Sequence, residues 1–507
     1  MYKILKCDKD AYITDKVIKG NRVSGSNVGG AGTLDLFKLY GSTFSASSPN
    51  VELSRLLIHF DMQPIRDLIA AGKLDVSNSS FNCTVKLFDV YGGQPTPNNF
   101  TISLYPLSRS FDEGQGRDVA FYSDLDVCNF KTGSRSQGSW IMSGCASGGY
   151  SSGPSCDFIT ASSVINSGAS LKSTQLFASG VEDLSIDVTT IVSATLAGLL
   201  PDLGFRISYD TTHENDTHSY FVKRFSSRTA YNEEKRPKLI VKYDDSVQDD
   251  SQNMYMDSTS YIFMYNYARQ SLANILSGSS LTPIVGQNCI ILKLSTEISG
   301  GVHNLIFTGS QHKIGTTFVS GVYSSSVYIP SSDQVVAYKL AQSGSVKFTP
   351  IWGSIDDTVA YVTGSSITVF PPQRGGAMLA AKQFVVSALG LLSSVAANVT
   401  IPVRINIFDH TSPYITIVKT PVTLAGIVVR DVHYQIRNYV TNNIEIPFDV
   451  IKNSTRASSD INGMFFMLNT DSLVAGRSYV IDVMIVTANG SQTYTSASPV
   501  FRVSDTQ

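Results

Sequence analysis

Charged side chains are scarce in this sequence. Asp, Glu, Lys and Arg make up 16% of the 507 residues, against about 25% in an average globular protein. Helices carry charged residues on their solvent face, so this deficit argues against a mainly helical fold. Ser, Thr, Asn and 38 Gly take the place of the charges, which favours β-strands with polar, uncharged faces and many turns. The formal net charge of −2 gives no electrostatic reason to expect nucleic acid or an anionic membrane as a partner.

Cysteine is sparse as well, and no C-x-x-C pair occurs. This absence excludes the ligand spacing of zinc ribbons and of thioredoxin-type redox sites. Cys145 and Cys156 flank a Gly/Ser-rich loop and could form a disulfide, whereas reduced, buried thiols are the simpler interpretation. The six cysteines are Cys7, Cys83, Cys128, Cys145, Cys156 and Cys289. We predict no metal ion and no cofactor.

No segment has the character of a targeting signal or of a membrane span. The start, Met1–Asp8, lacks the long apolar core and the small-residue cleavage site of a secretory signal. The one long uncharged stretch, Phe384–Val403, contains Asn398 and Pro402 and leads into a strand-like run, so we interpret it as sheet. We expect a soluble protein that is made in a cytoplasm and has no membrane partner.

Apolar and polar residues alternate in short runs along the whole chain. Tyr479–Val486 is the clearest example, and Val85–Tyr91, Leu239–Tyr243 and Val403–Phe408 are others. Such alternation places one face of a strand in a core and the other toward water. Many runs of this kind, separated by Gly, Ser and Asn turns, are typical of antiparallel sandwiches.

Few helices are expected, and they are short. One begins at Pro64, carries Ile65 and Leu68 on its apolar stripe and ends at Gly72. A second covers Thr190–Leu200. No repeat of strand, glycine loop and helix appears, which disfavours a doubly wound α/β fold.

The length predicts about three domains. The acidic run Asp244–Asp250 has the composition of a solvated linker, and Pro371–Gly376 ends an apolar strand. We therefore predict an all-β protein of tandem β-sandwich domains, jelly-roll or Ig-like, with a few short helices. The expected domains are residues 1–246, 247–372 and 373–507.

One motif matches the nucleophile elbow of esterases, G-x-S-x-G, at Gly149–Gly153 with Ser151 in the centre. That chemistry needs the serine on a strained turn between a buried strand and a helix. The flanks here are Gly and Ser, so we predict a loop without catalysis. An esterase or glycosidase would require Ser151, or a pair of acids, in a pocket beside a histidine.

A second cluster, His213–His218, packs possible metal ligands closely together. It is not H-E-x-x-H, because histidines five apart do not share a helical face. The cluster lies between the predicted strands Phe205–Tyr209 and Ser219–Lys223. We therefore expect a solvated hairpin tip.

The remaining polar candidates are not arranged in a pattern that predicts a catalytic or binding site. His59 alternates with apolar neighbours and is expected to be a half-buried strand residue. Asp112–Glu113 and Glu182–Asp183 are adjacent acids that point to opposite faces of a strand, so a glycosidase would need one from each pair. Trp140 could stack on a sugar ring but is expected in the core. We predict no catalytic, cofactor-binding or metal-binding residue, and no enzyme.

Pieces of the first domain occur in a recognisable order. They are Ala11–Asp15, Ser26–Gly29 with Thr33–Leu36, Ser54–Asp61, Phe225–Ala230 and the closing Lys235–Tyr243. On these pieces, about the first half of the chain resembles the DNRLRE family of β-sandwich domains of bacterial surface proteins and tailed-phage virion proteins. Bacterial members are suggested to bind carbohydrate, but no sugar-site motif is found here.

Two further stretches resemble phage virion proteins. Leu107–Asp118 is similar to the phage version of this domain, with Phe111 in place of the usual tryptophan. Ser472–Tyr479 and Pro499–Val503 are similar to the Ig-like domains that end many virion proteins.

These resemblances imply a non-enzymatic structural protein of a tailed-phage virion, located at the neck, collar, tail or capsid surface and assembled in the host cytoplasm. It would be present in several copies and would dock onto portal or neck, tail or capsid subunits. Arg22, Arg55 or Arg228 could supply surface anchors. The alternative is a carbohydrate-binding adhesin that recognises host-surface glycans through a shallow aromatic platform.

Overall fold

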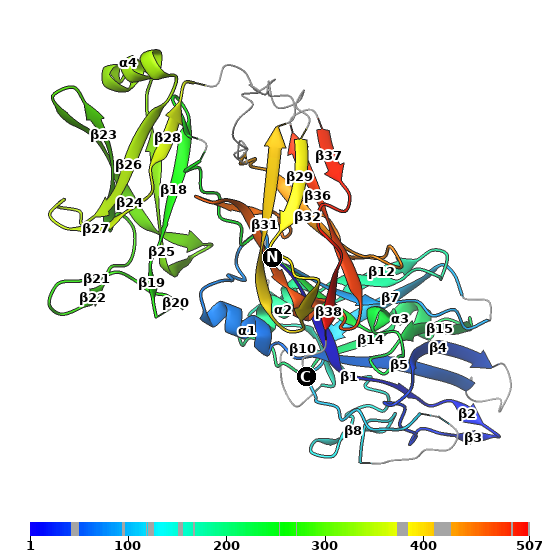
Figure 1. The fold of residues 1–507 in the computed structure, drawn as a ribbon. Helices are drawn as coiled ribbons and strands as arrows, with labels where there is room; N and C mark the ends of the chain where they lie inside the picture. The colour runs from blue at the N-terminus through cyan, green and yellow to red at the C-terminus, as the bar shows by residue number, and fades with distance from the viewer. Residues whose placement is uncertain are drawn as a thin grey trace. The chain divides into compact units, whose positions relative to one another are not determined.

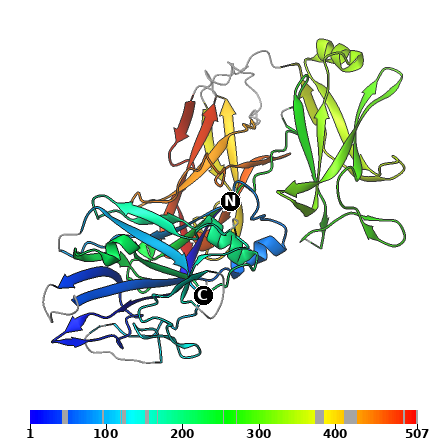
Figure 2. The same ribbon diagram turned by 180° about the vertical axis from the view of Figure 1, so that it is seen from behind.

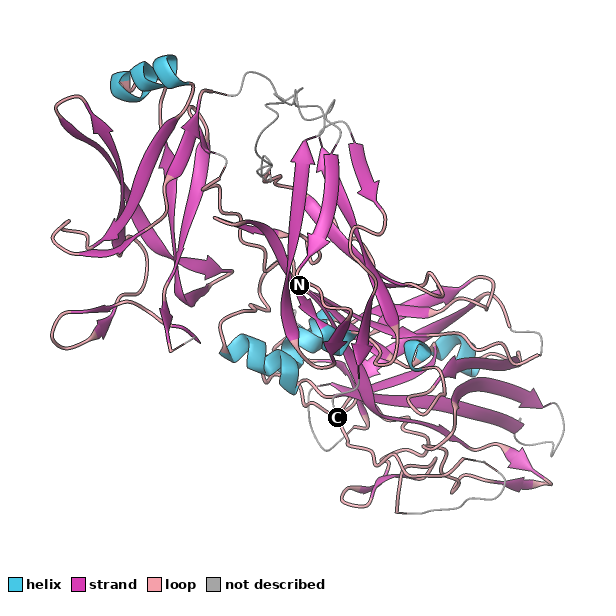
Figure 3. Cartoon of the chain, viewed as in Figure 1, coloured by secondary structure: helices cyan, strands magenta, loops and turns pink. Residues whose placement is uncertain are grey.

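The computed structural model shows a chain built of β-strands with short helices (Figure 1, Figure 3). The helices are α1 (Gln63–Ala70), α2 (Thr189–Leu196), α3 (Thr211–Asn215) and α4 (Gln334–Ser343). The structure describes residues 1–41, 50–93, 97–117, 119, 126–150, 156–165, 168–252, 254–269, 271–372, 384–409, 427–487 and 490–504. The predicted all-β class with tandem sandwiches is confirmed.

Contacts divide the chain into two compact units. The N-terminal unit comprises Lys3–Asp67 and Phe81–Lys242, and the C-terminal unit comprises Met1–Tyr2, Leu68–Ser80 and Tyr243–Gln507. The division after Lys242 falls close to the boundary predicted at residue 246. The predicted division at residue 372 lies inside the C-terminal unit and stays a prediction.

The N-terminal unit contains one ten-stranded sheet. Its strands are β1 (Tyr2–Thr14), β4 (Thr33–Gly41), β5 (Asn50–Phe60), β6 (Asn82–Leu87), β7 (Phe100–Pro106), β12 (Ser173–Phe177), β13 (Leu184–Asp187), β14 (Phe205–Tyr209), β15 (Tyr220–Ser226) and β16 (Lys238–Lys242). The order is β12-β7-β14-β5-β1-β16-β6-β13, and β4 joins β5 to β15. Figure 2 shows β4 and β5, in blue, side by side from behind.

Three short strand pairs lie in the loops of this unit. They are β2 (Val17–Ile18) with β3 (Asn21–Arg22), β8 (Thr132–Ser134) with β9 (Gly138–Ser139), and β10 (Gly148–Tyr150) with β11 (Phe158–Ala161). The predicted alternation is clear in β6, where Cys83, Val85 and Leu87 are buried and their neighbours are partly exposed. The strand ends at Leu87, four residues before the predicted end, because the chain then forms only a single bridge, from Asp89 to Phe225.

The two end strands of this sheet, β12 and β13, are joined by one side chain. The Nε2 of Gln175 on β12 donates to the carbonyl of Asp183 at 2.9 Å, and the main-chain N–H of Ser185 on β13 donates to Gln175 Oε1 at 2.6 Å. These bonds satisfy main-chain groups that an open sheet edge would expose to other chains.

Both predicted helices are present. The α1 helix places Ile65 in the core, and Gly72 follows it with a φ of +66°, a conformation in which glycine is favoured. In α2 the residues Ile191 and Val192 are buried, as predicted, but the helix ends at Leu196 rather than at Leu200.

The first part of the C-terminal unit is an eight-stranded sheet. Its strands are β17 (Met254–Tyr255), β18 (Thr259–Tyr265), β23 (Ile290–Ile298), β24 (Gly301–Ile314), β25 (Thr317–Tyr328), β26 (Val346–Gly353), β27 (Ala360–Thr363) and β28 (Ile367–Phe370). Two small hairpins pair β19 (Tyr267–Ala268) with β20 (Ser271–Leu272) and β21 (Leu276–Ser277) with β22 (Thr282–Pro283). The buried face of the sheet carries Tyr323, Phe348 and Trp352, against which Val336 of α4 also packs.

The second part of this unit is a two-sheet sandwich. Four strands form one sheet: β29 (Phe384–Leu389), β31 (Thr400–Asp409), β35 (Gly463–Asn469) and β34 (Ser458–Asp460). Six form the other: β30 (Ser394–Ala396), β38 (Phe501–Ser504), β36 (Ser478–Thr487), β32 (Val432–Asn438), β33 (Ile444–Ile446) and β37 (Gly490–Tyr494). Tyr434 of one sheet stacks on Phe466 of the other, with ring centroids 3.8 Å apart.

A tyrosine corner supports the Ig-like interpretation of this sandwich. Tyr479, near the start of β36, donates its hydroxyl to the carbonyl of Val474 five residues upstream, at 3.1 Å. The uncharged stretch Phe384–Val403 forms β29, β30 and the start of β31, as predicted. Within the described residues, none of the helices has the length and apolar character needed to span a bilayer.

The acidic run Asp244–Asp250 is not the solvated linker that composition predicted. Asp249 and Asp250 are buried. Asp250 exchanges main-chain and carboxylate hydrogen bonds with Tyr261 of β18, at 2.8 and 2.9 Å, and Ser459 of β34 donates to a main-chain carbonyl of the run at 2.8 Å. The run is buried because it supplies hydrogen-bond partners to two strands.

Candidate functional site

The motif serine Ser151 lies outside the described residues. The cluster His213–His218 does not form the predicted hairpin tip. It contains the short helix α3, and its flanking strands have different neighbours, since β14 pairs with β5 and β7 whereas β15 pairs with β4. His218 is exposed, but the acids of the cluster bind buried cations.

Arg55 is buried rather than on the surface, where it was predicted to act as an anchor. Its guanidinium donates two hydrogen bonds of 2.9 Å to the carboxylate of Glu214 and one of 2.7 Å to the carbonyl of Gly144. Arg206 donates to the carbonyl of Cys145 at 2.8 Å. Burial, together with the charge of Arg55, lowers the pKa of Arg206 to about 10. The two arginines therefore fasten the loop at Gly144 and Cys145 to the sheet.

The same loop is organised by a buried carboxylate. Asp157 accepts main-chain N–H bonds from Ile141, Met142 and Ser147, at 2.8, 3.1 and 3.0 Å. Trp140 is 5% exposed, and its indole N–H donates to a main-chain carbonyl at 2.9 Å. The prediction that Trp140 belongs to the core is confirmed, so its ring is not available to stack on a sugar.

The cysteines are reduced in this structure. All six are free thiols, and five of them are buried. Burial raises the pKa of Cys145 to about 12, so this thiol is protonated at neutral pH. The possible disulfide between Cys145 and Cys156 is not formed.

Two buried lysines hold loops in the same manner as the arginines. Lys38 donates from Nζ to Asp216 and to the carbonyl of His213, at 2.6 and 2.7 Å. Lys223 donates to Asp89 at 2.5 Å and to two main-chain carbonyls, at 2.8 and 2.9 Å. Because carboxylate and carbonyl oxygens surround each ammonium group, the cost of burying its charge is offset.

The adjacent acids accept hydrogen bonds from the main chain or from an arginine. Asp112, Glu182 and Asp183 each accept a main-chain N–H, at 2.9, 2.7 and 2.8 Å. Glu113 instead binds Arg228, which is described next. Among the described residues, no group of three or more His, Cys, Asp or Glu side chains could hold a metal ion.

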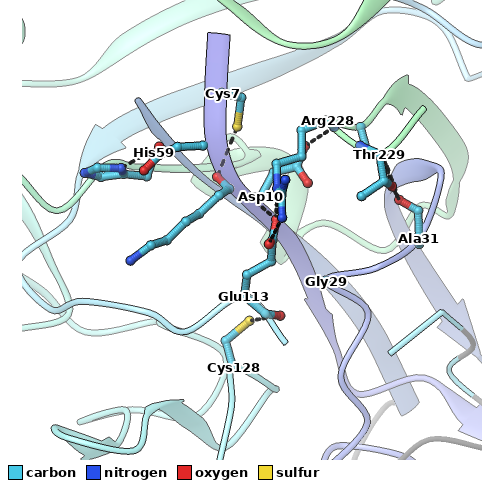
Figure 4. A network of polar contacts seen from close by, with 12 residues as sticks. Cys7, Asp10, Gly29, Ala31, His59, Glu113, Cys128, Arg228 and Thr229 are labelled. Atoms are coloured by element: carbon cyan, nitrogen blue, oxygen red, sulfur yellow. Dashed lines mark hydrogen bonds and ion pairs between the residues drawn. The ribbon is translucent and has the colours of Figure 1, made fainter. Parts of the chain in front are cut away.

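Asp10, Glu113 and Arg228 form a polar network beside β1 (Figure 4). Glu113 Oε1 accepts the main-chain N–H of Asp10 at 2.8 Å and the Nε of Arg228 at 2.5 Å. A second hydrogen bond joins Arg228 Nη2 to Glu113 Oε2. The main-chain N–H of Arg228 donates to Asp10 Oδ2 at 2.6 Å.

The other carboxyl oxygen of Asp10, Oδ1, has no hydrogen-bond partner among the described residues, although the residue is fully buried. Burial raises the pKa of Asp10 to about 7, and the neighbouring charge of Glu113 acts in the same direction. A protonated carboxyl is the less costly form for such a group, because an unpaired buried charge is strongly disfavoured. Asp10 therefore changes charge near neutral pH.

A histidine and a thiol lie beside this network (Figure 4). His59 is half-buried, as predicted, and its Nδ1 lies 2.7 Å from Asp8. Burial alone would lower the pKa of His59, but the hydrogen bond and charge of Asp8 outweigh it and raise the pKa. Burial and the nearby acids raise the pKa of Cys7 well above its ordinary range, so its thiol is not an activated nucleophile.

A groove of about 680 Å³ opens next to Glu113 and Arg228. It is lined by residues of the segments 29–32 and 113–117 and by Arg228 and Thr229. We call it the arginine groove. A Cβ atom at Gly30 would lie 2.7 Å from the carbonyl oxygen of Gln115, so glycine is required for the two segments to approach this closely.

Three of the segments that carry the family resemblance meet at this groove, through Gly29, Glu113 and Arg228. The side-chain amide of Asn27 donates to the carbonyls of Glu113 and Cys128, at 2.7 and 2.8 Å, and accepts from the N–H of Gly116 at 2.8 Å. Arg228 comes from the piece Phe225–Ala230. The sequence interpretation missed Asp10, because nothing in its spacing distinguishes it among 41 acidic residues.

A second surface lies on the eight-stranded sheet, on the side away from its core. Exposed residues alternate along β24, and the register of β24, β25 and β18 places the residues listed next on one face. They are Thr259, Tyr261, Phe263, Val302, Asn304, Ile306, Thr308, Ser310, Ser324, Ser326 and Tyr328. None of these residues is charged, and Tyr261, Val302, Ile306 and Tyr328 are about half exposed. The adjacent strand β23 places Lys293 opposite Ile306 and Glu297 opposite Val302, so charged residues border the patch on that side. We call this the uncharged face.

Comparison with known proteins identifies no family. No family model matches the chain, and no curated protein matches it either. Solved structures that are similar to this chain include the FN1–FN3 domains of chicken CNTN1, with 10% sequence identity, coverage of 64% of this chain and 79% of that chain, and a TM-score of 0.14. The amphioxus IgVJ-C2 molecule has 8% identity, coverage of 49% of this chain and 98% of that chain, and a TM-score of 0.12. An ICAM-5 D1–D4 ectodomain fragment has 10% identity, coverage of 97% of this chain and 99% of that chain, and a TM-score of 0.12. TM-scores this low give no basis for carrying over a function. The resemblance to the DNRLRE family stays a prediction.

Proposed function

We propose that the chain is a non-enzymatic structural protein of a tailed-phage virion that acts by docking onto other virion proteins. It would decorate the neck, collar, tail or capsid in several copies, without a cofactor. The observation that carries the proposal is the uncharged face of β18, β24 and β25. Interface cores are depleted of charge and enriched in aromatic residues, and Tyr, Val, Ile, Ser and Thr can be covered at little cost in desolvation.

The organisation of charge in the N-terminal unit supports the same proposal. Arg55, Lys38 and Lys223 hold loops by hydrogen bonds to carboxylate and main-chain carbonyl oxygens. Such a design stabilises long surface loops in one conformation, which a repeated docking contact requires.

Electron microscopy of intact particles tests the proposal. We expect copies of the chain at one ring or vertex, and we expect Ile306→Lys to remove them because it adds a charge to the uncharged face, beside Lys293 of β23. Val440→Lys is a matched control, since Val440 is 76% exposed and lies in the turn after β32, away from the uncharged face in sequence and in sheet pairing. The proposal fails if the protein occurs only as a free monomer in lysates, or if the Ile306→Lys protein is incorporated at the normal level.

The alternative, a carbohydrate-binding adhesin, would require an aromatic platform other than Trp140. A glycan array distinguishes the two functions, because strong and selective glycan binding by the isolated chain would favour the adhesin.

A further inference from the structure

The arginine groove contains hydrogen-bond donors that no described residue of the chain accepts from. Glu113 occupies the Nε and Nη2 positions of Arg228, and Nη1 has no partner among the described residues. The guanidinium of Arg117 and the side-chain amide of Gln115 also lack a partner within the described part of the chain. Guanidinium groups present planar pairs of donors that match a carboxylate.

The charge of the groove favours an anion. Arg117 and Arg228 contribute two positive charges, Glu113 contributes one negative charge, and Asp10 beneath them is largely neutral up to about pH 7. The groove is therefore positive in a chain whose net charge is −2.

The lining also indicates the kind of molecule that carries the anion. None of the described residues that line the groove is aromatic, so none of them offers a ring on which a sugar could stack. Its walls include main-chain atoms of Gly29, Gly30, Gly32 and Gly114. Exposed main chain beside an arginine pair suits a peptide, whose own N–H and C=O groups can bond to it.

We propose that the arginine groove binds an acidic segment of a partner protein, with an Asp or Glu carboxylate against Arg117 and Nη1 of Arg228. This inference shares with the proposed function only the idea of a protein partner. It concerns a different surface, and it is tested independently of any particle.

The experiment measures the fluorescence anisotropy of a fluorescein-labelled hexaglutamate peptide titrated with the purified full chain at low ionic strength. We expect saturable binding that weakens with added salt, and no binding of the uncharged hexaglutamine peptide. Arg117→Gln should weaken hexaglutamate binding by about fivefold, in line with one partly exposed ion pair. The control is Arg135→Gln, because Arg135 is exposed and lies outside the groove.

A second variant tests the groove by adding charge. The Cβ position at Gly32 meets no atom within 4 Å, so a side chain fits there. Gly32→Glu should weaken hexaglutamate binding through repulsion, whereas Gly32→Gln should weaken it less. Circular dichroism should be the same for all variants.

Three outcomes would overturn the proposal. They are no hexaglutamate binding by the unchanged protein, an equal loss with Arg135→Gln, or binding of an oligosialic acid through Arg117 while hexaglutamate does not bind. The particle test with Ile306→Lys has a separate readout, so either proposal can fail while the other holds.

Discussion

At the scale of single residues, the buried cations of the N-terminal unit hold its loops in place. Lys38, Lys223, Arg55 and Arg206 each bind oxygens that belong to loops. Removing one of these cations would leave carboxylate or carbonyl oxygens buried without a donor, which costs more than the ion pair contributes. We therefore expect substitution of these cations to lower the stability of the protein rather than to change an activity.

The first prediction concerns Lys223. Lys223→Met keeps the length of the side chain but leaves Asp89 and two loop carbonyls without their donor, so we expect a loss of about 3 kcal/mol in the free energy of unfolding. Urea unfolding, followed by Trp140 fluorescence in a Trp352→Phe background, reports the N-terminal unit, because the chain has only 2 Trp. Lys131→Met, at an exposed position, should change stability by less than about 0.5 kcal/mol.

The second prediction concerns Asp10 and pH. Its pKa is raised to about 7 in the folded chain, above the ordinary value of 3.8. The folded state therefore holds a proton that the unfolded state has lost, and the stabilisation from Asp10 declines as pH rises toward about 7, by about 1.4 kcal/mol per pH unit. Asp10→Asn cannot ionise, so its stability relative to the unchanged protein should increase between about pH 4 and about pH 7 and level off above that.

The measurement is urea unfolding across that pH range, again with Trp140 as the probe. Asp67→Asn, at an exposed position of α1, serves as the control and should give a curve parallel to that of the unchanged protein. Parallel curves for Asp10→Asn would show that Asp10 does not titrate in this range.

At the scale of elements, the alternation of apolar and polar residues predicted where the strands lie but not which side chains of other elements pack against them. Cys83, Val85 and Leu87 face inward as their spacing predicts, because the period of a strand is a local property. The burial of a charge is not local. Arg55 and Glu214 are 159 positions apart, so the sequence around Arg55 gives no sign that a carboxylate will cover it.

The acidic run shows the same limit at a strand edge. Asp250 accepts the N–H of Tyr261 on the outer edge of β18, and the carboxylate of the neighbouring Asp249 accepts the N–H of Ser251. Burial raises the pKa of Asp249 to about 6. The composition of the run predicted that its carboxylates would be exposed to solvent. Instead, they cover an edge strand that could otherwise pair with other chains.

The third prediction follows from this edge. Replacing both Asp249 and Asp250 by Ser removes the longer carboxylate acceptors, so we expect β18 to pair between molecules and the protein to self-associate. Sedimentation velocity at several concentrations checks it. Replacing Asp356 and Asp357 by Ser changes the net charge equally on an exposed turn and should leave the protein monomeric to the same degree as before. Equal behaviour of the two double variants would contradict the role given to the run.

At the scale of the whole molecule, the sequence predicted the fold class, and the division of contacts after Lys242 lies near the boundary expected at residue 246. It did not predict that Leu68–Ser80 groups with residues beyond 243, because such contacts connect distant positions. It also did not predict the arginine groove. Asn27, Glu113 and Arg228 lie in segments that resemble a family, but these segments are far apart in the sequence. Only the fold brings the three residues together with Asp10.

The two units have separate cores, and this leads to the last prediction. Phe225 is fully buried in the N-terminal unit and Phe348 in the C-terminal unit. Replacing either by Ala leaves a cavity and costs about 3–5 kcal/mol in the unit that contains it. Because each core belongs to one contact cluster, differential scanning calorimetry should resolve more than one transition. Phe225→Ala should lower the melting temperature of one transition and Phe348→Ala that of another, whereas an equal shift of all transitions by either change would mean that the chain unfolds as one cooperative body.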